Sequence, residues 1–175
     1  MWERKDYEMR STVKLDGIDD VMKTLQKEVT NIGLVTGKGL IRAVIIVRRD
    51  MDKTSPKIPV DLGNLRASFF TTSLKNGIAD LMPVSFKGDN ANKLGQTHAQ
   101  VKARAQSVAN QQGQPTVIFG FSANYAAYVH EMVGASFSRP DSGAKFLEAA
   151  LKRNKDAMIK VIAEEAKLKN KKKNE

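Results

Sequence analysis

Apolar residues in the first third of the chain recur at steps of three and four, which predicts an amphipathic helix at Asp16–Asn31. Asp16 suits the N-cap of that helix, because its carboxylate can accept hydrogen bonds from the first free backbone amides. A second helical stretch at 39–51 carries apolar residues on more than one stripe, so we expect it to be buried on two sides. The Ser55-Pro56 and Ile58-Pro59 steps should end it, because a residue before proline disfavours the helical conformation.

The middle of the chain changes to a pattern rich in Phe and Thr and bounded by turn residues. We expect a strand at Leu65–Leu74, a hairpin turn at Asn76-Gly77 and a returning strand at Ile78–Phe86. The clearest strand is Thr116–Phe121, with the sequence TVIFGF. These segments predict a small antiparallel sheet.

The last part of the chain returns to helical spacing. A short helix is expected at Ala123–Glu131 and a longer one at Ser142–Lys167. The apolar face of the longer helix comprises Leu147, Leu151, Met158, Val161 and Ile162. The predicted fold class is therefore α+β, with a long N-terminal helical region, a small antiparallel β-sheet and a C-terminal helix packed on the sheet. We expect one domain over residues 1–168, followed by a basic tail at 169–175.

The segment Lys87–Gln114 is polar and dominated by Asn, Gln, Lys, Ala and Gly. Its large apolar residues Leu94, Val101 and Val108 recur at seven-residue spacing, which allows a marginal helix with one thin stripe. That stripe alone buries too little area to offset the ordering entropy. We therefore favour a mobile insertion that orders on a partner surface.

The composition is that of a globular chain, with 41% apolar residues and a formal net charge of +10. The excess of basic over acidic residues is strongest from Lys145 to the end of the chain, which contains 10 basic and 5 acidic residues. The chain closes on Lys169, Lys171, Lys172 and Lys173. These four lysines can contact DNA phosphates or a partner, although a solvated end that aids solubility accounts for the charge more simply.

Several classes of function lack the residues that they need. The chain has no cysteine and two histidines, so thiolate zinc sites and cysteine nucleophiles are excluded and no metal site is expected. No apolar run is long enough to cross a membrane, and the charged start lacks the apolar stretch of a secretory signal. His130 and Glu131 form the one adjacent acid–base pair, for which a structural role is favoured over catalysis by a hydrolase. We expect no enzymatic activity, no cofactor and no small-molecule substrate.

Three segments taken in order are similar to a known family. They are Pro59–Ser68 (PVDLGNLRAS), Val117–Gly120 leading into Tyr125–Glu131 (YAAYVHE), and Gly143–Leu151 (GAKFLEAAL). In this order they resemble the tail-completion and head–tail joining proteins of tailed bacteriophages, also described as minor tail components. Leu62 stands where the family usually has Thr.

The resemblance implies a structural virion protein that forms a homo-oligomeric ring at the phage neck or tail, assembled in the host cytoplasm. Its partners would be copies of itself and neighbouring neck or connector, tail-tube or tail-terminator proteins, with possible non-specific contact to packaged DNA. The residues that match the family pattern are Pro59, Asp61, Gly63, Leu65, Arg66, Ser68, Tyr125, Tyr128, His130, Glu131, Lys145, Phe146 and Leu147. A non-specific DNA-binding protein that uses the basic C-terminal segment is the alternative.

The matched residues also suggest local roles. Pro59 should stop the long helix, and Gly63 should permit a tight reversal with positive φ. Arg66 can pair with Asp61 or with a carboxylate of a neighbouring subunit. Tyr125 and Tyr128 would share one helical face, with packed rings and hydroxyls at a rim. Phe146 and Leu147 would anchor the last helix onto the sheet.

Overall fold

A computed structural model describes residues 18–32, 37–73, 84–112 and 115–173, with the backbone alone for 27–32 and 166–173. Within these ranges the chain forms six helices and a two-stranded antiparallel sheet, which confirms the α+β class. The elements are α1 Ile18–Ile32, α2 Gly37–Lys53, α3 Asn64–Ala67, β1 Phe69–Ser73, α4 Ala91–Gln111, β2 Val117–Phe121, α5 Ala126–Glu131 and α6 Phe146–Lys173.

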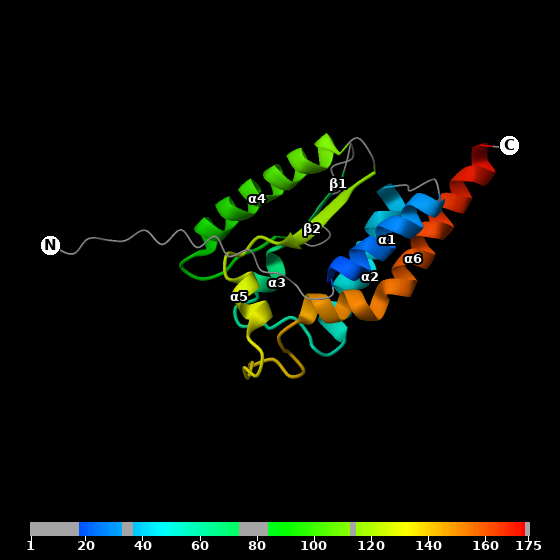
Figure 1. Cartoon of the computed structure of the whole chain (residues 1–175). Helices are drawn as coiled ribbons and strands as arrows, with labels where there is room; N and C mark the ends of the chain where they lie inside the picture. Colours follow the sequence, from blue (N-terminus) through cyan, green and yellow to red (C-terminus); the bar gives the residue numbers. More distant parts are fainter. Residues whose placement is uncertain (1–17, 33–36, 74–83, 113–114, 174–175) are drawn as a thin grey trace.

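The four longer helices divide into two groups around the sheet, and the short helices α3 and α5 lie apart from both (Figure 1). Helices α1, α2 and α6 lie together, with α2 and α1 both packed along α6. Helix α4 lies against β1 and β2, and α2 reaches β2 from the other group. The C-terminal helix α6 packs on the sheet side of the domain, as expected, and its first residue, Phe146, meets Phe121 of β2 edge-on at 5.6 Å.

Helices α2 and α6 approach closely because α2 has a glycine at the crossing point. A Cβ built on Gly39 would lie 3.1 Å from the Cα of Ile162 and 3.3 Å from the Cβ of Glu165. The glycine therefore marks a packing contact and not a weak point of the helix. Arg42, one turn later, pairs with Glu165 beside this contact.

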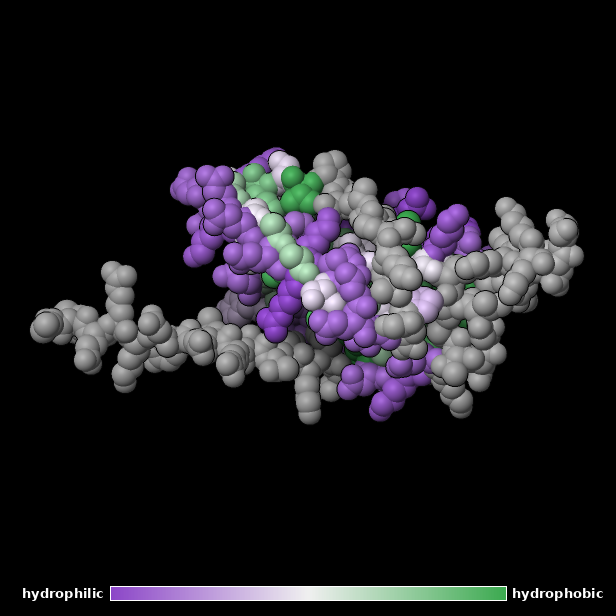
Figure 2. All heavy atoms as spheres, turned by 90° about the horizontal axis from the view of Figure 1, so that it is seen from above, coloured by the Kyte–Doolittle hydropathy of each residue, from purple (hydrophilic) through white to green (hydrophobic). Residues whose placement is uncertain are grey.

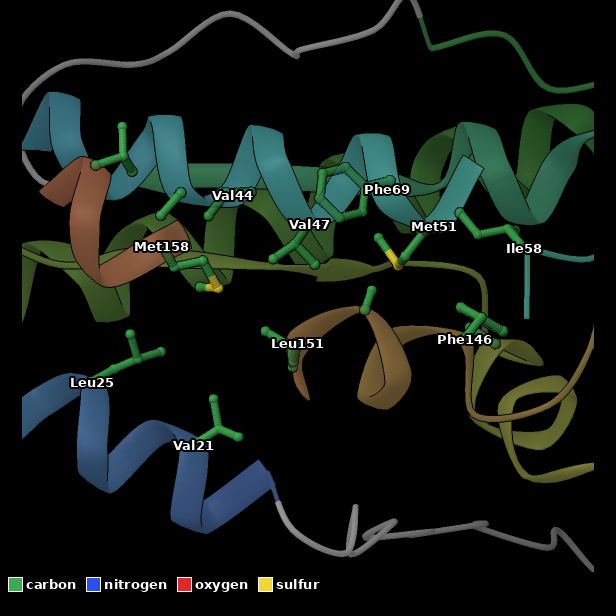
Figure 3. Packing of buried hydrophobic residues seen from close by; sticks show 14 of the residues in the cluster. Val21, Leu25, Val44, Val47, Met51, Ile58, Phe69, Phe146, Leu151 and Met158 are labelled. Atoms are coloured by element: carbon green, nitrogen blue, oxygen red, sulfur yellow. The ribbon is translucent and has the colours of Figure 1, made fainter. Parts of the chain in front are cut away.

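Aliphatic side chains from α1, α2 and α6 fill one continuous core (Figure 3). Val47 and Met51 of α2 are fully buried, and Leu151 and Met158 of α6 lie opposite them. Val44 and Val47 face α6 while Arg48 lies over the ring of Phe69, so α2 is buried on two sides, as its broad apolar stripe predicts. Leu147, expected on this face, is half-buried.

The two strands of the sheet are far apart in the sequence and differ from the hairpin that was predicted. Strand β1 pairs with β2 in antiparallel register, from Phe69 opposite Phe121 to Ser73 opposite Val117. The prediction of a hairpin with a returning strand at Ile78–Phe86 is wrong for residues 84–86, which form no strand. The turn at Asn76-Gly77 and the rest of that strand lie outside the described residues. All five residues of β1 are buried.

The polar segment Lys87–Gln114 contains a helix of 21 residues, so the prediction of a loop is wrong. Only part of the predicted apolar stripe of α4 is used, because Leu94 packs against the core and Val101 is partly buried, whereas Val108 is 42% exposed. The buried side chains of the helix are His98, Ala105 and Ala109. Small alanines bring its axis close to β1, and Gln106 binds Thr72 and the Ser73 carbonyl, the latter at 2.7 Å. Figure 2 shows that the outward face over α4 is largely hydrophilic, with a narrow line of more apolar atoms.

The segment expected to be one long strand begins with a helical turn. Helix α3 covers Asn64–Ala67, preceded by Gly63 with φ +87°, which confirms the predicted positive φ. Helix α2 ends at Lys53, three residues before Pro56. The expectation that Pro59 stops this helix is wrong, because Pro59 lies six residues beyond the helix end and is buried in the following turn.

Candidate functional site: a cleft and its charged surroundings

The turn of the first motif is joined to the start of α4 by one side chain. Asn64 accepts a hydrogen bond at Oδ1 from the backbone N–H of Lys87 at 2.8 Å. Its Nδ2 donates to the carbonyl of the same residue at 2.9 Å. The side chain of Asn64 is buried while Lys87 is exposed, so both bonds are partly buried. This two-point contact fixes the distance between the turn and α4.

A cleft of about 620 Å³ lies between these two elements. Its walls come from the 59–65 turn, the start of α4, the start of α5 and the loop at 136–138. The matched residues Pro59, Asp61, Gly63, Leu65 and Tyr125 all line it. The rest of the wall includes Leu62, Lys87, Asp89, Lys93 and Phe137. The cleft is thus amphipathic, with carboxylates and ammonium groups beside apolar side chains.

Tyr125 and Asp61 both contribute to the wall of this cleft. Burial raises the pKa of the Tyr125 phenol above its ordinary value, and the negative charge of Asp61 raises it further. The hydroxyl therefore stays protonated and can donate a hydrogen bond at any physiological pH. Leu62 and Gly88 come close together in the lining of the cleft, because a Cβ built on Gly88 would lie 3.1 Å from Cδ1 of Leu62.

The two tyrosines of the second motif have different environments. Tyr125 precedes α5 and is partly buried, whereas Tyr128 is 70% exposed. The prediction that both rings pack on one helical face is therefore wrong. Val133, just after α5, is 77% exposed. Large apolar side chains this exposed are candidates for contact with another chain.

A charged junction connects α5 to α6. Glu131 pairs with Lys145, and its Oε1 lies 2.8 Å from Nδ1 of His130. The backbone N–H of Lys145, a residue with φ +58°, donates to the carbonyl of His130 at 2.7 Å. The ring of Phe146 lies edge-on to the imidazole at 4.9 Å. The segments Tyr125–Glu131 and Gly143–Leu151 are thus directly connected through these contacts.

The hydrogen bonds of this junction shift two pKa values. Those from Lys145 and His130 lower the pKa of the Glu131 carboxyl below its ordinary value. The Glu131 carboxylate in turn raises the pKa of Lys145. Glu131 therefore holds a stable negative charge at neutral pH. Its oxygens are engaged in structural bonds, which favours the structural role assigned to the pair.

Arg66 binds a carboxylate that the sequence did not indicate. Its Nε lies 2.9 Å from Oδ1 of Asp52, and its Nη2 lies 3.1 Å from Oδ2. The alternative of a pairing with Asp61 is therefore wrong, and that of a carboxylate on a neighbouring subunit stays a prediction. Asp52 also forms an ion pair with Arg48, four residues earlier in α2, in which Nη1 of Arg48 lies 2.8 Å from Oδ2 of Asp52. Burial lowers the pKa of Arg48, while the charge of Asp52 opposes that shift.

Arg139 completes this cluster from the loop before α6. Its Nη2 donates to the carbonyl of Asp52 at 2.7 Å, and its Nη1 donates to the carbonyl of Ile58 at 3.2 Å. Three guanidinium groups therefore gather around one aspartate. Sequence reasoning missed Arg48, Asp52 and Arg139; the one available signal was an arginine on the apolar face of a helix, with Asp four residues later.

The matched residues thus gather in two places. Five line the cleft, and His130, Glu131, Lys145 and Phe146 form the α5–α6 junction. Ser68 is buried and links the first motif to the end of β2, since its carbonyl accepts from the backbone N–H of Ser122 at 2.9 Å. The basic residues Lys169, Lys171, Lys172 and Lys173 fall in the last turns of α6, and their side chains lie outside the described residues.

Among the described residues, no group of three or more His, Cys, Asp or Glu side chains is placed to hold a metal ion. No helix in the described part of the chain is long and apolar enough to cross a membrane. Comparisons with known protein families, with curated proteins and with solved structures found no match to this chain. The family resemblance therefore stays a prediction based on the three motifs.

Proposed function

We propose that the protein is a structural subunit that forms a closed ring at the head–tail junction of a tailed phage. The observation that supports this most is the way the three motif segments connect. The carbonyl of Ser68 accepts a hydrogen bond from Ser122, and Asp61 and Tyr125 both line the cleft. Lys145 contacts His130 through its backbone and Glu131 through its side chain. Residues far apart in sequence thus make one scaffold around a cleft.

The exposed side chains beside this scaffold suit contact with a neighbouring subunit. Tyr128 and Val133 project from α5 and from the turn that follows it, where they are 70% and 77% exposed. A tyrosine offers a large apolar area and a hydrogen-bonding hydroxyl, a combination enriched at protein interfaces. In a ring, each copy would bury this surface against a different surface of the next copy.

Deletion of the gene from its phage tests the role directly. Electron microscopy of the lysate should reveal separate heads and tails, because the joining ring is missing. Finished particles with firmly attached tails would contradict the proposal.

A point variant tests the proposed subunit contact in the purified protein. Tyr128→Glu should abolish rings in analytical ultracentrifugation and leave the urea unfolding midpoint unchanged, since the side chain is exposed. Met22→Glu is the matched control, because Met22 is also an exposed apolar residue, at 50%, but lies on α1. Equal loss of rings in both variants, or intact rings in Tyr128→Glu, would exclude Tyr128 from the interface.

A further inference from the structure

Charged side chains gather where α2 ends. We use the name α2-end patch for the charged residues of the last two turns of α2 together with those that reach them from other segments: Arg48, Arg49, Asp50, Asp52, Lys53, Lys57, Arg66, Arg139, Asp141 and Arg153. Each carboxylate of the patch has a cation. Asp50 binds Nη2 of Arg153 at 2.5 Å, and Asp141 binds Nζ of Lys57 at 2.8 Å. Asp52 binds Arg48 and Arg66.

The cations of the patch outnumber these carboxylates. Arg48 and Arg66 share Asp52, and Arg139 is held by two backbone carbonyls. Arg49 and Lys53 are exposed and pair with no carboxylate of the described residues. Seven cationic side chains thus face three carboxylates, an excess of four positive charges. The partial negative charge at the C-terminal end of α2 lowers the cost of collecting them there.

The guanidinium groups in this patch are positioned in advance. Arg66 is held by Asp52 through one hydrogen bond from Nη2 and an ion-pair contact at Nε, while 41% of its side chain stays exposed. Arg139 is fixed by its bonds to the carbonyls of Asp52 and Ile58. Each guanidinium has five donors, so both retain N–H groups for another acceptor. Phosphate is such an acceptor, and arginine is well matched to its geometry.

The charge of the chain indicates which kind of partner would cover the patch. The patch has an excess of four positive charges, so the same surface of a second copy would meet it with repulsion, whereas an anionic partner would be attracted. A phosphate backbone instead gains from each cation that it meets, because counterions are released. Among the described residues, the ring that stacks on a cation of the patch is Phe69 under Arg48; it is buried and therefore offers no platform for single-stranded bases.

We propose that the α2-end patch binds the phosphate backbone of double-stranded DNA without reading its sequence. Arg49 and Lys53 make the first contacts, because both are exposed and neither is held by a carboxylate of the described residues. Arg66 and Arg139 supply the pre-oriented guanidinium groups. The site is separate from the cleft and from the C-terminal lysines, and it does not depend on the ring proposed above.

Fluorescence anisotropy with a labelled random-sequence duplex tests this inference across a series of salt concentrations. The patch variant is Arg49→Gln with Lys53→Gln, which removes two exposed charges and leaves the ion pairs of Asp50, Asp52 and Asp141 in place. The matched control is Lys23→Gln with Arg104→Gln, which removes an exposed lysine of α1 and an exposed arginine of α4, neither of which lines the cleft. A third variant replaces Lys169, Lys171, Lys172 and Lys173 with Gln. Urea unfolding midpoints verify that all three are folded.

The wild-type protein should bind with an affinity that falls steeply with salt. In the patch variant the slope of log affinity against log salt should shrink by about two, and the affinity should fall roughly tenfold or more at about 0.1 M salt. The control with Lys23 and Arg104 replaced and the tail variant should lose much less. Equal losses in the patch variant and the control would overturn the assignment, as would a loss confined to the tail variant or an unchanged slope in the patch variant.

A competition experiment distinguishes DNA from an acidic protein surface as the partner of the patch. Polyglutamate should displace the duplex only at much higher charge-equivalent concentrations. If it binds as tightly as the duplex and its binding is lost in the patch variant, the partner is an acidic polypeptide and the DNA assignment is wrong.

Discussion

Aliphatic side chains fill the interface between α2 and α6, whereas α4 lies on the sheet through alanines, a histidine and a glutamine. In the first region, Val47 and Met51 of α2 pack opposite Leu151 of α6. In the second, Nδ1 of His98 lies 2.8 Å from Oγ of Ser122, and its ring meets those of Phe70 and Phe86 edge-on. One region is held by apolar area and the other by specific hydrogen bonds.

The difference predicts how each region responds to substitution. Apolar burial is non-directional and scales with area, so loss of one large side chain costs the most. A buried hydrogen bond adds a smaller net free energy but is costly to leave half made. We therefore expect the α2–α6 interface to dominate stability and the α4 layer to determine how precisely the sheet is positioned.

Met51→Ala should have the largest effect. Met51 is fully buried in the α2–α6 core, so the variant loses transfer free energy and leaves a cavity. We expect the free energy of unfolding to fall by about 2–5 kcal/mol, measured by urea titration. Ile46→Ala on the less buried side of α2 should cost clearly less. A similar cost for both variants would mean that the core is not centred on this interface.

Gly39→Val tests the close contact between the two helices. The added Cβ would meet the backbone of Ile162 at 3.1 Å, which a flexible side chain cannot relieve. The expected loss is about 1–3 kcal/mol in the same titration. Gly37→Val is the control, because nothing in the described residues lies within 4 Å of its built Cβ. If the two variants unfold alike, helix propensity and not packing decides the effect.

Ser122→Ala tests the α4 layer. Its hydroxyl bonds to His98 and to the Ser68 carbonyl at 3.2 Å, so the variant removes two buried bonds without creating a large cavity. We expect a loss of about 1–2 kcal/mol. Hydrogen exchange should be accelerated more in α4 and β1 than in α2 and α6. Uniform acceleration across the molecule would contradict the separation into two regions.

Glu131→Gln should have the smallest effect, and the effect should depend on pH. The folded protein lowers the pKa of Glu131, so its ion pair stabilises the fold above the ordinary carboxyl pKa of 4.5. This stabilisation is lost as the pH falls through the lower pKa of the folded state. The variant should be less stable by at most about 1 kcal/mol at about pH 7, because the pair is partly exposed. A difference that persists unchanged in strong acid, below the pKa of the folded state, would contradict this origin.

The sequence predicted the elements whose signal is apolar periodicity or turn chemistry. The α1, α2 and α6 helices follow from aliphatic spacing, and the reversal at Gly63 follows from the glycine in PVDLGN. Helix α4 was expected to be a loop because its thin apolar stripe buries little area, and the burial of its alanines, His98 and Gln106 depends on the sheet beneath it. The pairing of β1 with β2 joins residues 44 or more positions apart, which local patterns do not encode.

The candidate site shows the same limit. Five matched residues line the cleft, since turn and helix starts are local features. The partner of Arg66 was predicted incorrectly because Asp61 is near in sequence, whereas Asp52 is placed beside Arg66 by the folding of the whole 53–66 connection. Arg139 reaches the same aspartate from 87 positions away. Pairings of this kind are set by tertiary structure.

Asn64 has a consequence for how related sequences could diverge. Its amide binds both polar groups of Lys87, the N–H and the carbonyl, much as an adjacent strand would. A change to a residue with a shorter or charged side chain would break one or both bonds and let the two walls of the cleft separate. The size of the opening can therefore change by substitution at a single position, while the hydrophobic interior stays as it is. Substitution at position 64 therefore acts on the geometry of the cleft and leaves the α2–α6 core untouched.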